Sequence, residues 1–240
     1  VAAWSAQSDQ QDAYFGVDVS SAGDVNGDGY ADVVVGAHGY AGPTYGEGRA
    51  FLFLGSASGL PVTADWIGES NRAGAQYASS VSSAGDVNGD GYGDLIVGAS
   101  HFANGQTDEG VAFVYLGSAT GLAGAAAWMG ESNLVGARFG WSVASAGDAN
   151  GDGYGDVIVG ARLYTNGQQE EGAAFFYLGS ASGLSMSAAW TAESNQDSAW
   201  FGHAVSSAGD VNGDGFGDVL VGARVYDNGE IDEGAAFLYY

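Results

Sequence analysis

The sequence predicts an all-β protein, a β-propeller whose four-stranded antiparallel blades come from four copies of one 62-residue unit. The nonapeptide DVNGDGYAD at Asp24 recurs as DVNGDGYGD at Asp86, DANGDGYGD at Asp148 and DVNGDGFGD at Asp210, each start lying 62 residues after the last. A short β-branched run follows each nonapeptide and is too brief for a stable helix. Repeated four-stranded meanders can stack radially, so that each sheet buries both faces against its neighbours.

Each unit is expected to supply four strands in meander order. In the first unit a strand over residues 15–23 precedes the acidic nonapeptide, which forms the hairpin to a second strand. In the second unit that second strand covers residues 95–99, and its continuous apolarity indicates burial on both faces. Third strands are expected at residues 50–54, 111–116, 173–178 and 235–240. A shorter fourth strand carries the periodic Trp4, Trp66, Trp128 and Trp190, whose rings are expected to pack on the outer strands.

The two ends of the chain are out of step with the repeat. The strand around Trp4 has the phase of a fourth, outer strand, whereas the last unit stops at its third strand. We therefore expect the N-terminal strand to complete the last blade, in trans or in cis. Residues 1–240 are predicted to form a single propeller domain, with repeat loops at 24–32, 86–94, 148–156 and 210–218.

Composition and charge narrow the class of partner. With 46% apolar and 12% aromatic residues among 240, the chain can form a large core. Twenty-nine acidic against five basic residues give a formal charge of -24, which argues against nucleic acid and anionic membrane surfaces as partners. No apolar stretch approaches the roughly 20 residues of a membrane-spanning helix, so no membrane insertion is expected. Cysteine is absent, which leaves oxygen as the main type of metal ligand.

The acidic nonapeptides have the donor pattern of a calcium site. Side chains at positions 1, 3, 5 and 9 carry oxygen, and position 7 can present its backbone carbonyl. Calcium takes six to eight oxygens at about 2.3 to 2.6 Å, whereas magnesium needs a smaller octahedron and zinc prefers nitrogen or sulfur. We expect one structural Ca²⁺ per repeat, four per chain. The predicted ligands are Asp24, Asn26, Asp28, Tyr30, Asp32, Asp86, Asn88, Asp90, Tyr92, Asp94, Asp148, Asn150, Asp152, Tyr154, Asp156, Asp210, Asn212, Asp214, Phe216 and Asp218.

The nonapeptides allow two other interpretations, as plain turns or as parts of helical calcium-binding modules. They can be plain turns rich in Asn, Asp and Gly, although four copies that all keep the oxygen side chains argue against this. They can also begin an EF-hand or dockerin-type helical module. An EF-hand needs a bidentate acid at position 12 and flanking helices, and position 12 is Val35, Val97, Val159 and Val221.

Three motifs in a fixed order make the chain resemble the FG-GAP repeats of the integrin alpha-subunit β-propeller and its bacterial relatives. In the first unit they are Phe15-Gly16, the loop at 24–32, and Val35-Gly36-Ala37. The second unit departs with Tyr77-Ala78, and the Pro of GAP is replaced in every unit. The resemblance implies a calcium-stabilised propeller used in cell adhesion or ligand binding. Integrin propellers have seven blades, and packing suited to seven fits eight better than four. We therefore expect a homodimer that forms an eight-bladed ring, with a closed four-bladed monomer as the alternative.

A ligand, either a protein or a glycan, is expected on the face opposite the acidic hairpins. A periodic aromatic residue follows each second strand there, and sugar rings stack on such side chains. The alternative is that these rings pack against the strands and line the mouth of the ring. Positions 14, 76, 138 and 200 vary between the units, as a binding rim or a tolerant surface would. The candidate ligand-face residues are Tyr40, Phe102, Tyr164 and Tyr226.

Catalysis is not expected. His38, His101 and His203 occupy unmatched phases, and none belongs to a recognisable catalytic or metal-binding arrangement. The alternatives that remain are a calcium-dependent carbohydrate-active enzyme and a purely structural or engineered repeat protein without a ligand. Calcium is millimolar outside cells, so the loops favour an extracellular, cell-surface or periplasmic location.

Overall fold

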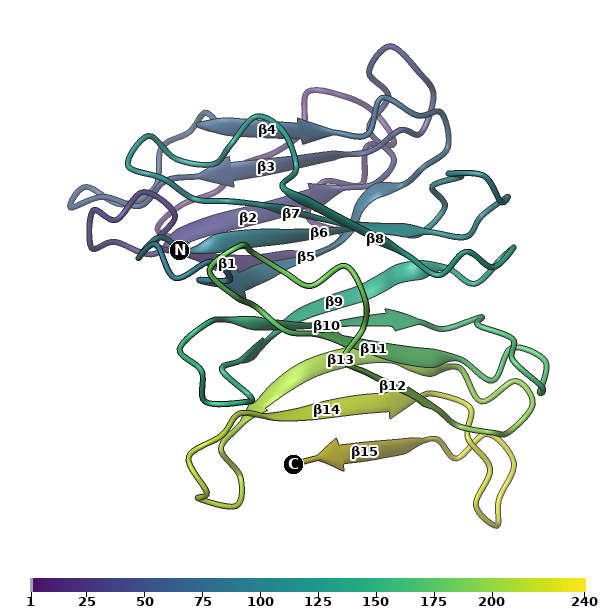
Figure 1. Cartoon of the computed structure of the whole chain (residues 1–240). Helices are drawn as coiled ribbons and strands as arrows, with labels where there is room; N and C mark the ends of the chain where they lie inside the picture. The colour runs from purple at the N-terminus through teal and green to yellow at the C-terminus, as the bar shows by residue number, and fades with distance from the viewer. Residues whose placement is uncertain (1) are drawn as a thin grey trace.

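Four antiparallel sheets stacked one after another make up the fold (Figure 1). The computed structural model describes residues 2–240 and contains fifteen strands. We call the sheets blades 1 to 4 in chain order. Blade 1 contains β1 (Val19–Gly23), β2 (Asp32–Ala37), β3 (Arg49–Phe53) and β4 (Trp66–Glu69). Blade 2 contains β5 (Tyr77–Gly85), β6 (Asp94–Ala99), β7 (Val111–Tyr115) and β8 (Trp128–Glu131). Blade 3 contains β9 (Phe139–Gly147), β10 (Asp156–Ala161), β11 (Ala173–Tyr177) and β12 (Trp190–Glu193). Blade 4 contains β13 (Phe201–Gly209), β14 (Asp218–Ala223) and β15 (Ala235–Tyr239).

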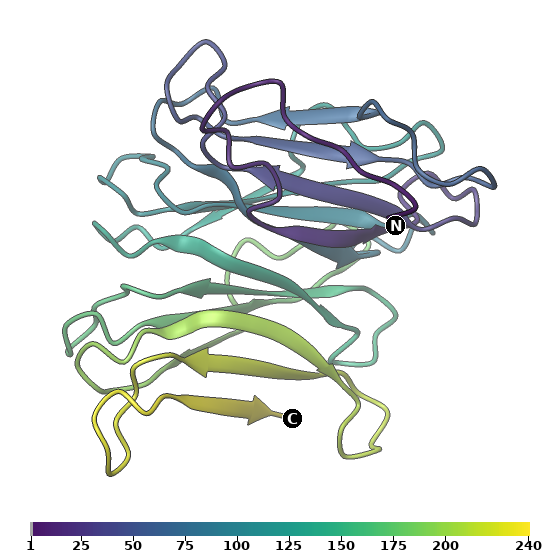
Figure 2. The same cartoon turned by 180° about the vertical axis from the view of Figure 1, so that it is seen from behind.

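The predicted all-β fold of repeated meanders is confirmed. Blades 1 to 3 are four-stranded meanders, and blade 4 has three strands in the described part of the chain. The first strands of neighbouring blades, β1, β5, β9 and β13, lie side by side and form the inner side of the stack. Figure 2 shows the same stack from behind, with the N-terminus at blade 1 and the C-terminus at blade 4. Within residues 2–240 no helix is long and apolar enough to cross a membrane.

The second strands of blades 2 and 3 are buried on both faces, as their sequence predicts, whereas Leu220 of β14 is exposed. All six residues of β6 and of β10 are buried between the neighbouring sheets. Each second strand pairs with the first strand through a register shift beside the acidic loop, for example between Ser83 and Gly85. Gly85 has φ +77°, a conformation that costs glycine little. A bulge of this kind turns the chain at the strand end and directs the following Asp86 into the loop.

The first strands of blades 2 to 4 begin with an aromatic residue and a small one, such as Phe139-Gly140, and this aromatic-small pair packs between neighbouring blades. Phe139 and Phe201 are fully buried between sheets, and Tyr77 takes their place in blade 2. The next residue is small because the preceding blade lies against it: a Cβ on Gly140 would lie 2.5 Å from the carbonyl oxygen of Val111 in β7. The glycine of the preceding blade's second strand is in equally close contact. A Cβ on Gly98 would lie 2.0 Å from the carbonyl oxygen of Gly140, and one on Gly160 would lie 2.0 Å from that of Gly202. Both parts of the repeated motif therefore serve the packing of backbone against backbone.

The outer-strand Trp series packs across the blade boundaries, as expected. Trp66 lies edge-on to Tyr115 of the next blade at 5.0 Å between ring centroids, and Trp128 does the same with Tyr177 at 4.9 Å. The indole N–H of Trp128 donates to the carbonyl of Ser185 at 2.9 Å. The rings of Trp66 and Trp128 thus bury apolar area and satisfy their one donor.

The expected closure of blade 4 by the N-terminal strand is not present in cis. Residues around Trp4 form no strand, and β15 pairs only with β14 among the described residues. Trp4 instead lies edge-on to Phe53 of blade 1 at 5.0 Å and donates its indole N–H to Pro61 at 2.7 Å. Four blades stacked in one direction leave the two termini at opposite ends of the stack (Figure 1).

Candidate functional site

The four acidic nonapeptides connect the first and second strands of the blades, as predicted. The hairpins between β9 and β10 and between β13 and β14 lie at one edge of the stack, and the connection from β14 to β15 lies at the other (Figure 1). Because every blade is the same meander, the repeat places all four acidic loops on one face. The connections from second to third strand lie on the opposite face.

Within each loop the acidic side chains accept backbone N–H groups and hold the loop in a tight curl. In blade 1 the two carboxylate oxygens of Asp24 accept from the N–H of Asp28 at 3.0 Å and of Gly29 at 2.8 Å. Asp28 accepts from the N–H of Tyr30 at 3.0 Å and from the amide nitrogen of Asn26. Each oxygen keeps a second lone pair, because a carboxylate can accept about four hydrogen bonds or metal bonds. The curl thus gathers oxygens without exhausting them.

The acid at position 9 of each loop holds the loop in place through hydrogen bonds that the sequence pattern does not reveal. Asp94 is fully buried, and its two carboxylate oxygens accept from the N–H groups of Val87 and Gly117, each at 2.8 Å. The first bond closes the loop, and the second ties the loop to the segment that follows the third strand. Asp32 and Asp156 make the corresponding pairs of bonds. In blade 4, Asp218 accepts only from Val211 among the described residues.

Burial and mutual repulsion perturb these carboxyl groups. Burial raises the pKa of Asp94 to about 6, although the N–H groups of Gly117 and Val87 lower it, and Asp90 and Asp86 raise it further. The same causes raise the pKa of Asp32, in the order burial first and the neighbours Asp24 and Asp28 last. Charged together, the acids of a loop therefore oppose one another, and a divalent cation would relieve that repulsion.

The donor set of each loop fits a hard cation, but no three ligating side chains converge. In residues 2–240 no group of three or more His, Cys, Asp or Glu side chains is arranged to hold a metal ion. The oxygens available are those of three acids and one Asn per loop, together with backbone carbonyls. All are the ligands that calcium prefers. The predicted ligand set, including the position 7 carbonyls, stays a prediction.

Two of the four residues of the predicted ligand face are buried, and the face itself stays a prediction. Tyr40 and Phe102 are 9% and 7% exposed. Phe102 lies edge-on to Phe113 of its own third strand at 5.6 Å, and Tyr164 and Tyr226 pack in the same way on Phe175 and Phe237. These rings cap the outer part of each blade, as the packing alternative proposed. Their spacing in the sequence predicted that they lie opposite the acidic loops, but it could not show that each packs on a ring of the third strand.

A different group of side chains gathers on that face near the inner strands. We call Trp141, Arg162, Trp200, His203 and Arg224 the rim cluster. The guanidinium carbon of Arg162 lies 3.6 Å from the ring centroid of Trp141 and 5.0 Å from that of Trp200. His203 stacks on Trp200 at 6.1 Å, and Arg224 lies over the same indole at 5.8 Å. Two blades thus contribute to one layered assembly of cations and aromatic rings.

The rim cluster carries a positive field. Burial lowers the pKa of His203, and Arg162 and Arg224 lower it further. Burial also lowers the pKa of Arg162, as do Arg138 and Arg224, while Glu170 opposes them. The two other histidines lie on the same face, and burial lowers the pKa of His101 to about 4. The position of the repeat that Trp200 occupies varies between the units in the sequence. That its side chain meets those of Trp141 and Arg162 depends on contacts between blades, which the sequence does not show.

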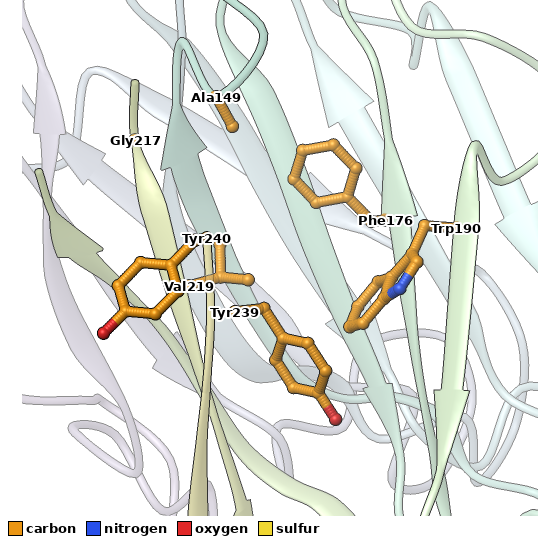
Figure 3. A pocket seen from close by; sticks show the side chains of 7 residues that line it. All are labelled: Ala149, Phe176, Trp190, Gly217, Val219, Tyr239 and Tyr240. Atoms are coloured by element: carbon orange, nitrogen blue, oxygen red, sulfur yellow. The ribbon is translucent and has the colours of Figure 1, made fainter. Parts of the chain in front are cut away.

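A separate apolar hollow lies between blades 3 and 4, and the repeat explains it. Figure 3 shows this hollow of about 220 Å³, with Trp190 and Phe176 on one side and Val219 and Tyr239 on the other. At the preceding boundary, Leu184 of the segment after the third strand packs against Trp128 and Val114. The hollow therefore lies at the place in the repeat that Leu184 occupies at the preceding boundary.

Comparison with known proteins matches the chain to one repeat family. The model of an FG-GAP-like repeat matches residues 16–97, and that of the FG-GAP repeat matches residues 139–177 and 201–239. Integrin alpha pat-2 of Caenorhabditis briggsae is 32% identical over 222 residues, which are 85% of this chain and 17% of that protein. Integrin alpha-V of Gallus gallus is 30% identical over 88% of this chain and 20% of its own length.

Relatives with an enzyme name also match. Phosphatidylinositol-glycan-specific phospholipase D of Homo sapiens is 34% identical over 220 residues, which are 85% of this chain and 26% of that protein. The chain thus spans between 17% and 26% of the length of these three relatives. Their names cover both non-enzymatic and enzymatic proteins, and the part that they share with this chain is a repeat fold.

Proposed function

The chain belongs to the FG-GAP repeat family, and from that premise we propose that it is an extracellular, calcium-stabilised propeller module that binds a ligand in adhesion. Calcium holds the acidic hairpins on one face of the stack. The ligand, a protein or a glycan, binds on the opposite face. In this proposal calcium is structural and takes no part in contacting the ligand.

One observation carries the calcium part of the proposal. Four loops, one in each blade, repeat the same buried and N–H-clamped carboxylates and the same exposed oxygens. Backbone N–H groups hold Asp24 and Asp28 in place, so the loop loses little freedom when an ion binds. The integrin alpha relatives, whose names denote cell-surface adhesion proteins, support the extracellular setting, where calcium is abundant.

A calorimetric titration with calcium tests the proposal. We expect the chain to bind about four Ca²⁺ per molecule, one in each loop, and to bind Mg²⁺ far more weakly because magnesium demands a smaller octahedron. Asp86→Ala should remove one site, since Asp86 supplies both oxygens that accept the N–H groups of the second loop. Glu230→Gln, an exposed acid outside the loops, should leave the stoichiometry unchanged. Absence of calcium binding, or an unaltered stoichiometry in Asp86→Ala, would contradict the proposal.

A further inference from the structure

In residues 2–240 the rim cluster brings together two of the five basic residues of a very acidic chain. The chain has five Arg and no Lys, against 29 acidic residues. Three of the five Arg lie on the face opposite the acidic loops, namely Arg138, Arg162 and Arg224. Arg138 is paired with Asp108 at 3.0 Å, which leaves Arg162 and Arg224 as the cations of the cluster, with Glu170 nearby. Such a patch attracts a group of negative charge.

Two donors of the cluster and one ring nitrogen of His203 are buried and have no hydrogen-bond partner among the described residues. Within residues 2–240 the indole Nε1 of Trp200, the Nε of Arg162 and the Nδ1 of His203 find no hydrogen-bond partner. Leaving a buried donor unsatisfied costs about 1 to 3 kcal/mol, so native proteins seldom leave several together. A carboxylate placed beside Arg162 and Trp200 would accept from the guanidinium and from the indole N–H. A negatively charged group of a ligand would offer these atoms an acceptor.

A small apolar hollow adjoins the cluster. It has a volume of about 150 Å³ and is lined by Val17, His38, Gln76, Ser79 and Trp141, so residues of three blades meet there. Its size suits one apolar or aromatic side chain. A uronate sugar also carries a carboxylate, but its several hydroxyl groups would need more polar partners than His38, Gln76 and Ser79 provide. The hollow therefore favours a peptide over a glycan.

The backbone fixes the direction of the side chains that reach this face. Trp200 and Arg138 have φ of 54° and 62°, in the left-handed region that bulky residues seldom adopt. Tyr14 and Gln76 share this conformation at the same phase in the first two blades. The turn thus belongs to the repeat, and its strain holds whichever side chain occupies the phase toward the rim.

We infer that the rim cluster binds an acidic peptide segment of a protein partner, with a carboxylate held by Arg162 and Arg224 and the adjoining apolar side chain seated in the hollow. The inference rests on the proposed ligand-binding function and names the class of ligand. It differs from the predicted ligand face, because the residues that make contact are those that vary between the repeats. Arg162 stacked on Trp141 has little freedom left to lose when it pairs with a carboxylate.

Selection from a random nonapeptide display library tests this inference. The immobilised chain is presented in millimolar calcium, with soluble Arg162→Gln protein in excess as competitor. We expect the selected pool to be enriched in Asp or Glu beside a Phe, Leu or Trp. Fluorescence anisotropy on the enriched peptides should show at least a tenfold loss of affinity for Arg162→Gln, as expected when a charged hydrogen-bonded pair is broken.

The control is Arg72→Gln, which removes the same charge from an exposed position outside the cluster and should bind as the unmodified chain does. Trp200→Phe keeps the ring but removes the N–H, and it should weaken binding while the protein stays folded. A pool without acidic enrichment, equal binding to Arg162→Gln, or tighter binding of an oligogalacturonate than of any peptide would each overturn the inference. Chelator-insensitive melting would contradict the calcium scaffold and leave this result intact.

An independent set of observations concerns the two open ends of the stack. At the internal boundaries a Cβ on Gly36, Gly98 or Gly160 would lie 2.0 to 2.2 Å from the next blade's carbonyl oxygen. At the equivalent Gly222 of blade 4, the nearest atom is the Cβ of Ala204 at 3.7 Å. Gly16 of blade 1 has nothing within 4 Å, whereas its counterpart Gly140 presses on the preceding blade. Each end therefore carries half of the contact that joins internal blades.

Trp4 already occupies the position of an outer-strand Trp that belongs to a preceding blade. Its contact with Phe53 and its bond to Pro61 repeat those of Trp66 with Tyr115 and Ala123. By the register of the internal blades, where Leu52 pairs with Trp66 and Arg49 with Glu69, residues 4–7 would pair with residues 235–238 of another molecule. That pairing would add the fourth strand to blade 4.

We propose that a second copy of the chain completes blade 4 through its residues 4–7, so that two copies form an eight-bladed ring. The boundary between copies is weaker than an internal one. Ala204 stands where Asp18 and Ser80 accept a backbone N–H of the next blade, so one hydrogen bond is missing there. The dimer should therefore dissociate reversibly on dilution.

Multi-angle light scattering over a concentration series measures the mass. The 24.1 kDa chain should approach twice that mass as its concentration rises. Gly222→Ala should stay folded, because the single chain has room for the methyl group, yet remain monomeric, because the second copy's Gly16 would clash with it. Trp4→Ala should also be monomeric. A chain that stays at 24.1 kDa at high concentration, or a Gly222→Ala variant that dimerises as well as the parent, would overturn the proposal.

Discussion

In excess chelator the chain should melt at least about 20 °C below its melting temperature in millimolar calcium. An ion at 100 times its dissociation constant stabilises the folded state by about 2.7 kcal/mol per site, so four sites supply on the order of 10 kcal/mol. That is comparable to the whole free energy of unfolding of a typical domain, about 5 to 15 kcal/mol. For a chain of this size 1 kcal/mol corresponds to roughly 2 to 4 °C.

The physical cause of this loss lies in the empty loops. Asp94 is held in a buried position with Asp86 and Asp90 near it, and burial together with their charges raises its pKa to about 6. At neutral pH the folded chain must keep these acids charged and close together, whereas the unfolded chain separates them. Calcium removes that penalty in the folded state alone.

Differential scanning calorimetry in calcium, in chelator and in chelator with excess magnesium makes the measurement. Magnesium should restore little of the lost stability, which separates specific coordination from screening by divalent ions. An unchanged melting curve in chelator, or full recovery in magnesium, would contradict a structural role for calcium.

The repeat fold could be predicted from the sequence because the information is local and occurs four times. The run at residues 95–99 indicates a doubly buried strand by itself, and the same run at the same phase in every unit fixes the order of the strands. The aromatic-small pair was identified as a family marker, but its reason needed the structure. Gly98 and Gly140 belong to different blades, and only their contact explains why both must be small.

The candidate site divides in the same way. The oxygen pattern of the loops is local, so the predicted ligands could be named residue by residue. The hydrogen bond that Asp94 accepts from the N–H of Gly117 spans 23 residues, so the local pattern could not reveal it. The predicted ligand face stays a prediction, but the contacts that cover the ring of Phe102 with the third strand are not local either. The rim cluster was missed because Trp141 and Trp200 are brought together only by the stacking of two blades.

Gly98→Ala should destabilise the chain by at least about 3 kcal/mol, which corresponds to roughly 6 to 12 °C in melting temperature. The added Cβ would lie 2.0 Å from the carbonyl oxygen of Gly140, which is backbone and cannot move aside as a flexible side chain would. Blades 2 and 3 would have to separate along their inner strands. That separation would loosen the core around Phe139, Val143 and Val157.

Gly222→Ala is the matched control, since Gly222 has the same place in β14 that Gly98 has in β6. Its Cβ would meet the methyl group and the carbonyl oxygen of Ala204, each at 3.7 Å, which is ordinary van der Waals contact. Chemical denaturation at concentrations where both variants are monomeric should therefore show a large loss of stability for Gly98→Ala and less than about 1 kcal/mol for Gly222→Ala. Equal losses would mean that strand propensity, which both substitutions change alike, decides the effect, and that the close approach of neighbouring blades does not.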